Sequence, residues 1–136
     1  MKSEHLENLH PGWVLGGWAV SVAVTSAAYL AVVGAGLLPA GPGEVLGLAL
    51  AMSVGFFAGG LFVGLRWAEA PILHGTAMTL TSVVVWFAGS LALPGRTQTL
   101  ATSIPAILGL ILLQLGATVG GGWGGRRTAL SGRTPV

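Results

Sequence analysis

The chain has 136 residues, of which 53% are hydrophobic and only 7% are charged. Soluble domains carry about 25% charged residues, so this chain has too little charge to cover a water-facing surface, and its mean hydropathy of +0.82 agrees. Its six basic residues form no concentrated patch of the kind that nucleic-acid binding requires, which argues against a nucleic-acid partner. The absence of cysteine excludes disulfides, thiolate metal sites and cysteine nucleophiles.

The polar segment 1–12 comes first, and we expect it to form a short cap at the membrane surface. It does not resemble a signal peptide, because it carries as much acid as base and the apolar run after it is too long. The first membrane span is predicted at 13–38, a length sufficient to cross a bilayer core of about 30 Å. Pro11 suits the first helical turn, and Trp13 is placed as an interfacial anchor.

Three further spans follow in chain order. A turn rich in Pro and Gly at 39–44 leads to a second span at 45–65, and a charged turn at 66–71 leads to a third at 72–93. A loop at 94–103 precedes the fourth span at 105–125, and residues 126–136 form a polar tail. We therefore expect one transmembrane domain over 13–125 with a segment outside the membrane at each end.

Small residues recur four apart in three of these spans, which lets another helix approach closely. In the first span the stripe consists of alanines, namely Ala23, Ala27, Ala31 and Ala35. In the second and fourth spans the expected helix-packing residues are Gly47, Gly55, Gly59, Gly60, Gly64, Gly116, Gly120, Gly121, Gly124 and Gly125. These two glycine-rich spans are predicted to meet at the centre of the molecule.

The distribution of basic residues predicts the orientation. Four spans put both termini on one side, and that side holds Lys2, Arg66, Arg126, Arg127 and Arg133. The other side holds only Arg96. The positive-inside rule therefore places both termini and the 66–71 turn in the cytoplasm.

An internal repeat connects the two halves of the chain. At a constant offset of 61 positions, Gly55, Gly59, Gly60, Gly64 and Arg66 correspond to Gly116, Gly120, Gly121, Gly125 and Arg127. Each unit contains two spans, so the copies are parallel. The predicted fold is an all-α membrane protein with four transmembrane helices, arranged as two parallel two-helix repeats in a pseudo-twofold bundle.

A set of Gly, His and Trp motifs runs through the first three spans: Pro11-Gly12-Trp13 with Gly16 and Gly17, then Gly59-Gly60-x-x-x-Gly64-x-Arg66, then Leu73-His74-Gly75 and Trp86. This set resembles the YrzE-type family of small bacterial four-helix membrane proteins, some of them labelled PhnA-like. The resemblance covers roughly 13–93, with a weaker echo in the fourth span. It implies a multi-pass protein of the bacterial inner membrane, and it implies no catalytic residues.

His74 is the candidate ligand residue. A neutral imidazole at a helix end can bind the metal of a haem or a chlorophyll. The alternative is an interfacial histidine bonded to the 66–71 turn or to a neighbouring helix. A haem in the bundle would need a second axial ligand, and His5 and His10 lie outside the spans, so we expect no cofactor.

The remaining polar candidates lie at the surface or deep in one span. Arg66 and Glu69 either pair in a small cytoplasmic site or act as topology determinant and helix cap. Arg126 and Arg127 are placed to meet anionic lipid headgroups. Gln114, the most polar group deep in a span, either bonds one helix to another or lines a substrate path.

The interiors of the predicted spans contain no charged residue and no catalytic constellation. We therefore expect a protein that is not an enzyme. The favoured function is that of a structural or accessory subunit of a respiratory or photosynthetic complex, in contact with the lipid bilayer and with other membrane subunits or further copies of itself. One alternative is a small oligomeric channel or transporter, with a pore lined by hydroxyl groups and exposed carbonyls from the first and third spans. The other is a subunit that holds a pigment or haem through His74.

Overall fold

The structure is a computed structural model that describes residues 6–37, 42–67, 69–92 and 104–132. In this part of the chain a 3-10 turn, η2 (Leu6–Asn8), precedes four α-helices. They are α1 (Pro11–Gly34), α2 (Pro42–Arg66), α3 (Pro71–Ala92) and α4 (Ile104–Ser131). All four are long and apolar enough to cross a membrane. The predicted all-helical architecture with four such helices is therefore confirmed.

Each helix begins at or next to a proline. Pro11, Pro42 and Pro71 are the first residues of α1, α2 and α3, and Pro105 is the second residue of α4. Proline suits these positions because its φ angle is already helical and its missing N–H would have no partner in the first turn. The observed helix starts consequently lie within three residues of the predicted ones.

The end of α1 differs from the prediction. The helix ends at Gly34, and Gly36 adopts the left-handed φ of 66°. The Gly36 N–H donates to the Val33 carbonyl over 3.0 Å, and the Leu37 N–H donates to the Val32 carbonyl over 3.2 Å. This pair of bonds is the Schellman arrangement, which closes a helix around a left-handed glycine. It stops α1 before the predicted end at 38.

The end of α4 also differs, in the opposite direction. The helix continues through Arg126 to Ser131, across most of the segment predicted as a polar tail. The Thr128 hydroxyl donates to the Gly124 carbonyl over 3.0 Å, and the Gly132 N–H donates to Thr128 over 3.1 Å. Hydropathy marks where an apolar span ends, but a helix continues wherever its backbone bonds can form.

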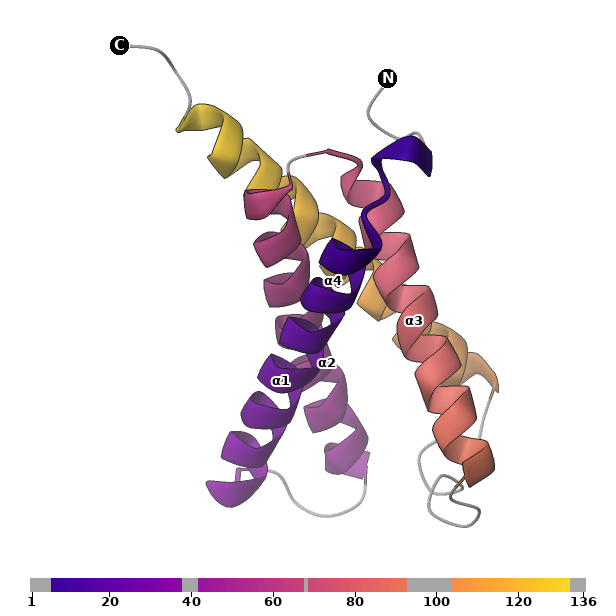
Figure 1. Ribbon diagram of the computed structural model, residues 1–136. Coiled ribbons are helices and arrows are strands. Elements are labelled where there is room, and N and C mark those ends of the chain that lie inside the picture. Colours follow the sequence, from indigo (N-terminus) through magenta and orange to yellow (C-terminus); the bar gives the residue numbers. More distant parts are fainter. Residues whose placement is uncertain (1–5, 38–41, 68, 93–103, 133–136) are drawn as a thin grey trace.

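The four helices share one closed end (Figure 1). There α1 and α3 begin, and α2 and α4 end. The most extensive contact is between α2 and α4, followed by that between α1 and α2, whereas α1 and α3 contact each other much less. A small core of Val14, Val63 and Met78 lies near the closed end, and α1 and α3 diverge toward the opposite end. The helix α2 therefore takes part in the two most extensive contacts of the fold.

Several predicted features lie outside the described residues. They are positions 39–41 of the first turn, the loop at 94–103, the predicted end of the first span at 38, and the charged residues Lys2, Arg96 and Arg133.

Candidate functional site

The first glycine row of α2 lies against α1. A Cβ added at Gly55 would meet the backbone of Ser21 and Thr25 closer than 3.0 Å. A Cβ at Gly59 would meet the Ser21 hydroxyl and the Gly17 carbonyl equally closely. Because the obstacles include backbone atoms, only glycine allows α1 and α2 to approach this far.

The second glycine row of α2 lies against α4. A Cβ added at Gly60 would collide with the Thr118 carbonyl, and one at Gly64 would collide with the Gly122 carbonyl. The backbones of the two helices are therefore in direct contact at this crossing. Gly47, which belongs to the same predicted set, is buried in α2.

The matching row of α4 makes the reciprocal contacts with α2. A Cβ at Gly121 would collide with the Phe57 carbonyl, and one at Gly125 would meet the Leu61 carbonyl closer than 3.0 Å. Gly124 lies beside this row, and its added Cβ would make only an ordinary contact of 3.8 Å with Leu61. Each helix thus presents two glycines to the carbonyls of the other.

Gly116 and Gly120 differ from the other predicted packing glycines. Both are exposed, and an added Cβ at either would meet nothing within 4 Å. The expectation that they pack against another helix of this chain is wrong for the described residues. The reason is that α3 contacts a different face of α4, where Gly122 lies next to Pro71.

The alanine stripe predicted for the first span is also wrong. Ala23, Ala27, Ala31 and Ala35 are all exposed, and α1 instead contacts α2 through Gly17, Ser21 and Thr25. Sequence reasoning missed Gly17, Gly75 and Gly122 as close-contact positions. The row on α1 could have been identified from the sequence. Gly17, Ser21 and Thr25 are small residues four apart, and Gly17 belongs to the glycine motif of the first span.

His74 lies on the first turn of α3 and is only 1% exposed. Its Nδ1 is 3.0 Å from the Ala70 carbonyl oxygen, and its Nε2 accepts a hydrogen bond of 3.3 Å from the His10 backbone N–H. A carbonyl only accepts and a backbone N–H only donates, so these partners assign the neutral tautomer with its hydrogen on Nδ1. Protein groups therefore engage both ring nitrogens.

Trp67 completes the connection between the N-terminal segment and the turn before α3. Its indole N–H donates to the Asn8 carbonyl over 3.2 Å. Its ring meets the His10 ring edge-on, with centroids 4.9 Å apart and an interplanar angle of 61°. The segment from η2 to His10 is thereby held against the closed end of the bundle.

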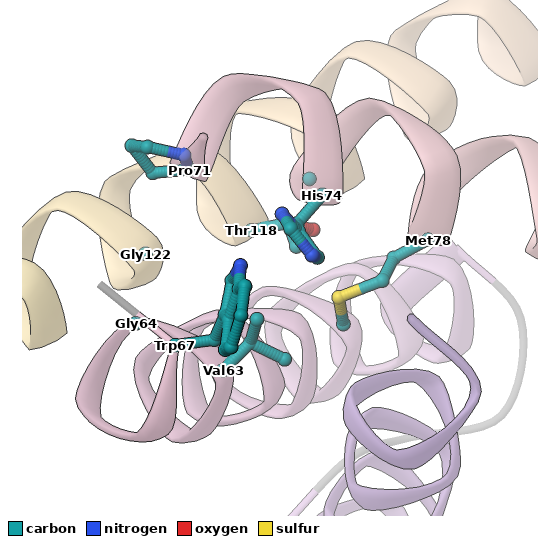
Figure 2. A pocket seen from close by; sticks show the side chains of 10 residues that line it. Val63, Gly64, Trp67, Pro71, His74, Met78, Thr118 and Gly122 are labelled. Carbon is teal, nitrogen blue, oxygen red and sulfur yellow. The ribbon is translucent and has the colours of Figure 1, made fainter. Parts of the chain in front are cut away.

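The cavity beside His74 is small (Figure 2). It has a volume of about 10 Å³ and lies among Gly60, Val63, Gly64, Trp67, Pro71, His74, Gly75, Met78, Thr118 and Gly122. Such a volume holds about one water molecule, whereas small-molecule sites occupy roughly 300–1,000 Å³. Neither this space nor the engaged imidazole fits a haem or chlorophyll.

The predicted surface charges all lie toward the closed end. Arg66 and Glu69 are exposed and form no ion pair in the described part of the chain. The Arg126 guanidinium lies 5.6 Å from the centre of the Trp123 ring, in a cation–π contact. Arg127 is exposed on the same turn of α4.

Several of the hydroxyls of the first and third spans, which the channel hypothesis assigned to a pore, are bonded within their own helices. Ser21, Thr79 and Thr81 donate to carbonyls four residues earlier, over distances of 2.8–3.0 Å. Serine and threonine commonly satisfy their hydroxyl hydrogens in this way inside apolar helices. These hydroxyls therefore do not donate to a solute path between α1 and α3.

Comparisons with protein-family models, with curated proteins and with solved structures find no match to this chain. The resemblance to the YrzE-type family stays a prediction, and the functional argument depends on the geometry described above.

Proposed function

We propose that this chain is a non-catalytic integral membrane protein that packs, as an accessory subunit, against a larger complex in the bacterial inner membrane. The membrane location is supported by the four long apolar helices and by side chains such as Leu30, Leu80 and Leu112, each more than 60% exposed. In water an apolar surface of this extent would be an aggregation liability. In a bilayer it is the outer face of a helix bundle.

The orientation that we propose is supported by the charges at the closed end. Arg66 ends α2, and Arg126 and Arg127 lie on the last turns of α4 at the same end. The positive-inside rule favours the cytoplasm for this end and for both termini.

The open glycine row of α4 carries the accessory hypothesis. At the offset of 61 positions, Gly116 and Gly120 correspond to Gly55 and Gly59, which α1 covers. The reciprocal glycine-to-carbonyl contacts of α2 and α4 support a local pseudo-twofold relation between them. If this relation also holds for the open row, a helix in the position of α1 should lie against Gly116 and Gly120. No described helix of this chain occupies that position.

A transmembrane helix of a different subunit is the occupant that fits this row. The α1 row that covers the equivalent glycines of α2 consists of Gly17, Ser21 and Thr25. In a second copy of this chain the same row would already be in contact with its own α2. We therefore propose that the partner helix belongs to a different subunit and presents small or hydroxyl side chains four apart.

The test compares the native assembly of three forms of the full chain. Wild type, Gly120→Leu and Gly89→Leu are extracted gently from native membranes, separated on a native gel and located by mass spectrometry. Gly89, on α3, is the matched control because an added Cβ there also meets nothing within 4 Å. We expect wild type and Gly89→Leu to migrate in a large complex and Gly120→Leu to migrate alone with unchanged helical content.

Two results would contradict the proposal. One is migration of wild type alone or as a homo-oligomer. The other is recovery of Gly120→Leu in the same complex, and in the same amount, as wild type.

A further inference from the structure

A second, much larger cavity lies between the helices on the side away from the closed end. Its volume is about 420 Å³, within the range of small-molecule sites. All four helices line it, through Trp18, Val22, Leu48, Met52, Ser82, Val83, Val85, Trp86, Ile107, Leu110, Ile111 and Gln114. None of these twelve residues is charged, so the cavity suits a neutral, mostly apolar molecule.

Gln114 is the polar residue of this cavity whose side chain bonds to no described residue. It is 8% exposed, and its side-chain amide forms no hydrogen bond with any described residue. The Thr118 hydroxyl donates over 2.6 Å to the Gln114 main-chain carbonyl and leaves the side chain unengaged. An amide offers two N–H donors and one carbonyl acceptor, and leaving such a group unpaired in an apolar interior is unfavourable. A bound molecule with a complementary group would remove this penalty.

Two tryptophans form part of the cavity wall. The Trp18 indole N–H donates to the Ser82 hydroxyl oxygen over 3.0 Å, which connects α1 to α3 at the cavity. On α3, Val85 and Trp86 are 46% and 44% exposed, so the cavity wall extends to the outer surface of the molecule. In the membrane location proposed above, that surface faces lipid, and an apolar ligand would enter from the bilayer.

We propose that this cavity binds the uncharged, carbonyl-bearing part of a membrane lipophile, whose carbonyl accepts a hydrogen bond from the Gln114 amide while the apolar body contacts Trp18 and Trp86. Two membrane components share this chemistry, namely the ester carbonyl of a phospholipid and the ring carbonyl of an isoprenoid quinone. The inference depends on the proposed membrane location but not on the accessory role.

The experiment uses the full-length protein in nanodiscs of phosphatidylethanolamine and phosphatidylglycerol, with a naphthoquinone carrying one isoprenoid unit as the quinone probe. Quenching of tryptophan fluorescence reports the probe, because Trp18 and Trp86 line the cavity. Native mass spectrometry after release into detergent reports any retained phospholipid. Circular dichroism verifies that each variant is folded.

Three variants separate the cavity from the rest of the molecule. Gln114→Leu removes the amide at similar size, and Val83→Trp fills the cavity. Thr25→Val is the matched control, because it removes a buried hydroxyl that also has no partner but lies at the α1–α2 contact. We expect both cavity variants to weaken binding at least tenfold and Thr25→Val to leave it unchanged.

Saturable quenching that follows this pattern identifies a quinone, and one phospholipid retained in the same pattern identifies a lipid. The proposal is overturned if wild type neither binds the probe saturably nor retains a phospholipid. It is equally overturned if Gln114→Leu binds as tightly as wild type, a result that decides the question even if Val83→Trp does not fold. The native-gel test of the accessory role can succeed or fail independently of this outcome.

Discussion

The helices α2 and α4 have the same glycine pattern in different surroundings. In α2 both rows are covered, the row of Gly55 and Gly59 by α1 and the row of Gly60 and Gly64 by α4. In α4 only one row is covered, and Gly116 and Gly120 face open space. Glycine spacing therefore indicates which faces of a helix another backbone can approach, but the path of the rest of the chain decides which faces are used.

The difference originates at the turn before α3. Ala70 has a left-handed φ of 45°, and its carbonyl accepts the His74 backbone N–H over 3.0 Å. This turn brings Gly75 against Val119 and Pro71 against Gly122. Because α3 contacts that face of α4, no described helix covers the row of Gly116 and Gly120, whereas α1 runs along the corresponding row of α2.

Gly60→Leu should produce the largest effect on the covered rows. The new side chain would collide with the Thr118 carbonyl, which cannot move unless α4 shifts. Overpacking of this kind should lower the free energy of unfolding in detergent by about 3 kcal/mol or more. Gly116→Leu, where nothing lies within 4 Å, should change it by less than about 0.5 kcal/mol. Equal losses in the two variants would mean that the rows do not differ.

Gly59→Ala and Gly120→Ala sharpen the comparison, because the two positions correspond in the repeat. At Gly59 the added methyl would meet the Ser21 hydroxyl and the Gly17 carbonyl, so we expect a loss of about 2 kcal/mol. At Gly120 the methyl meets nothing, and replacing a helical glycine by alanine should add about 0.5 kcal/mol. Denaturant titration followed by circular dichroism measures both. An increase in the free energy of unfolding for both Gly59→Ala and Gly120→Ala would contradict the close contact between α1 and α2.

His74→Leu tests the turn that directs α3. The substitution removes the acceptor of the His10 N–H and leaves that donor without its partner. We expect a loss of about 1–3 kcal/mol, faster proteolysis of the segment before α1 and a shift in Trp67 emission. Thr76→Val is the control, because its exposed hydroxyl bonds only to the Ile72 carbonyl of its own helix. Unchanged proteolysis in His74→Leu would show that the histidine does not hold the N-terminal segment.

Much of the fold was predictable because its signals are local. Apolar length predicted four spans, and Pro11 indicated the first turn of the first helix. The end of α1 was also local, since it depends on Gly36, but hydropathy continues past that residue and concealed it. The end of α4 was missed for the converse reason, because loss of hydropathy does not end a helix.

The sites were less predictable because their partners are distant in the sequence. The N–H that engages His74 belongs to His10, 64 positions earlier. The cavity around Gln114 needs residues from all four helices, so only the unusual polarity of the glutamine was visible in advance. Which glycine row stays open depends on the face of α4 that α3 contacts, and the repeat alone predicts equal use of both rows.

The most direct test of the accessory hypothesis is site-specific photo-crosslinking in native membranes. A photoreactive residue at Leu112, which is 67% exposed one turn before Gly116, is compared with one at Leu80, which is 61% exposed on α3. We predict a discrete adduct with a different protein from position 112 and only lipid adducts from position 80. Lipid adducts alone at position 112, or an adduct with a second copy of this chain, would contradict the claim that another subunit covers the open glycine row.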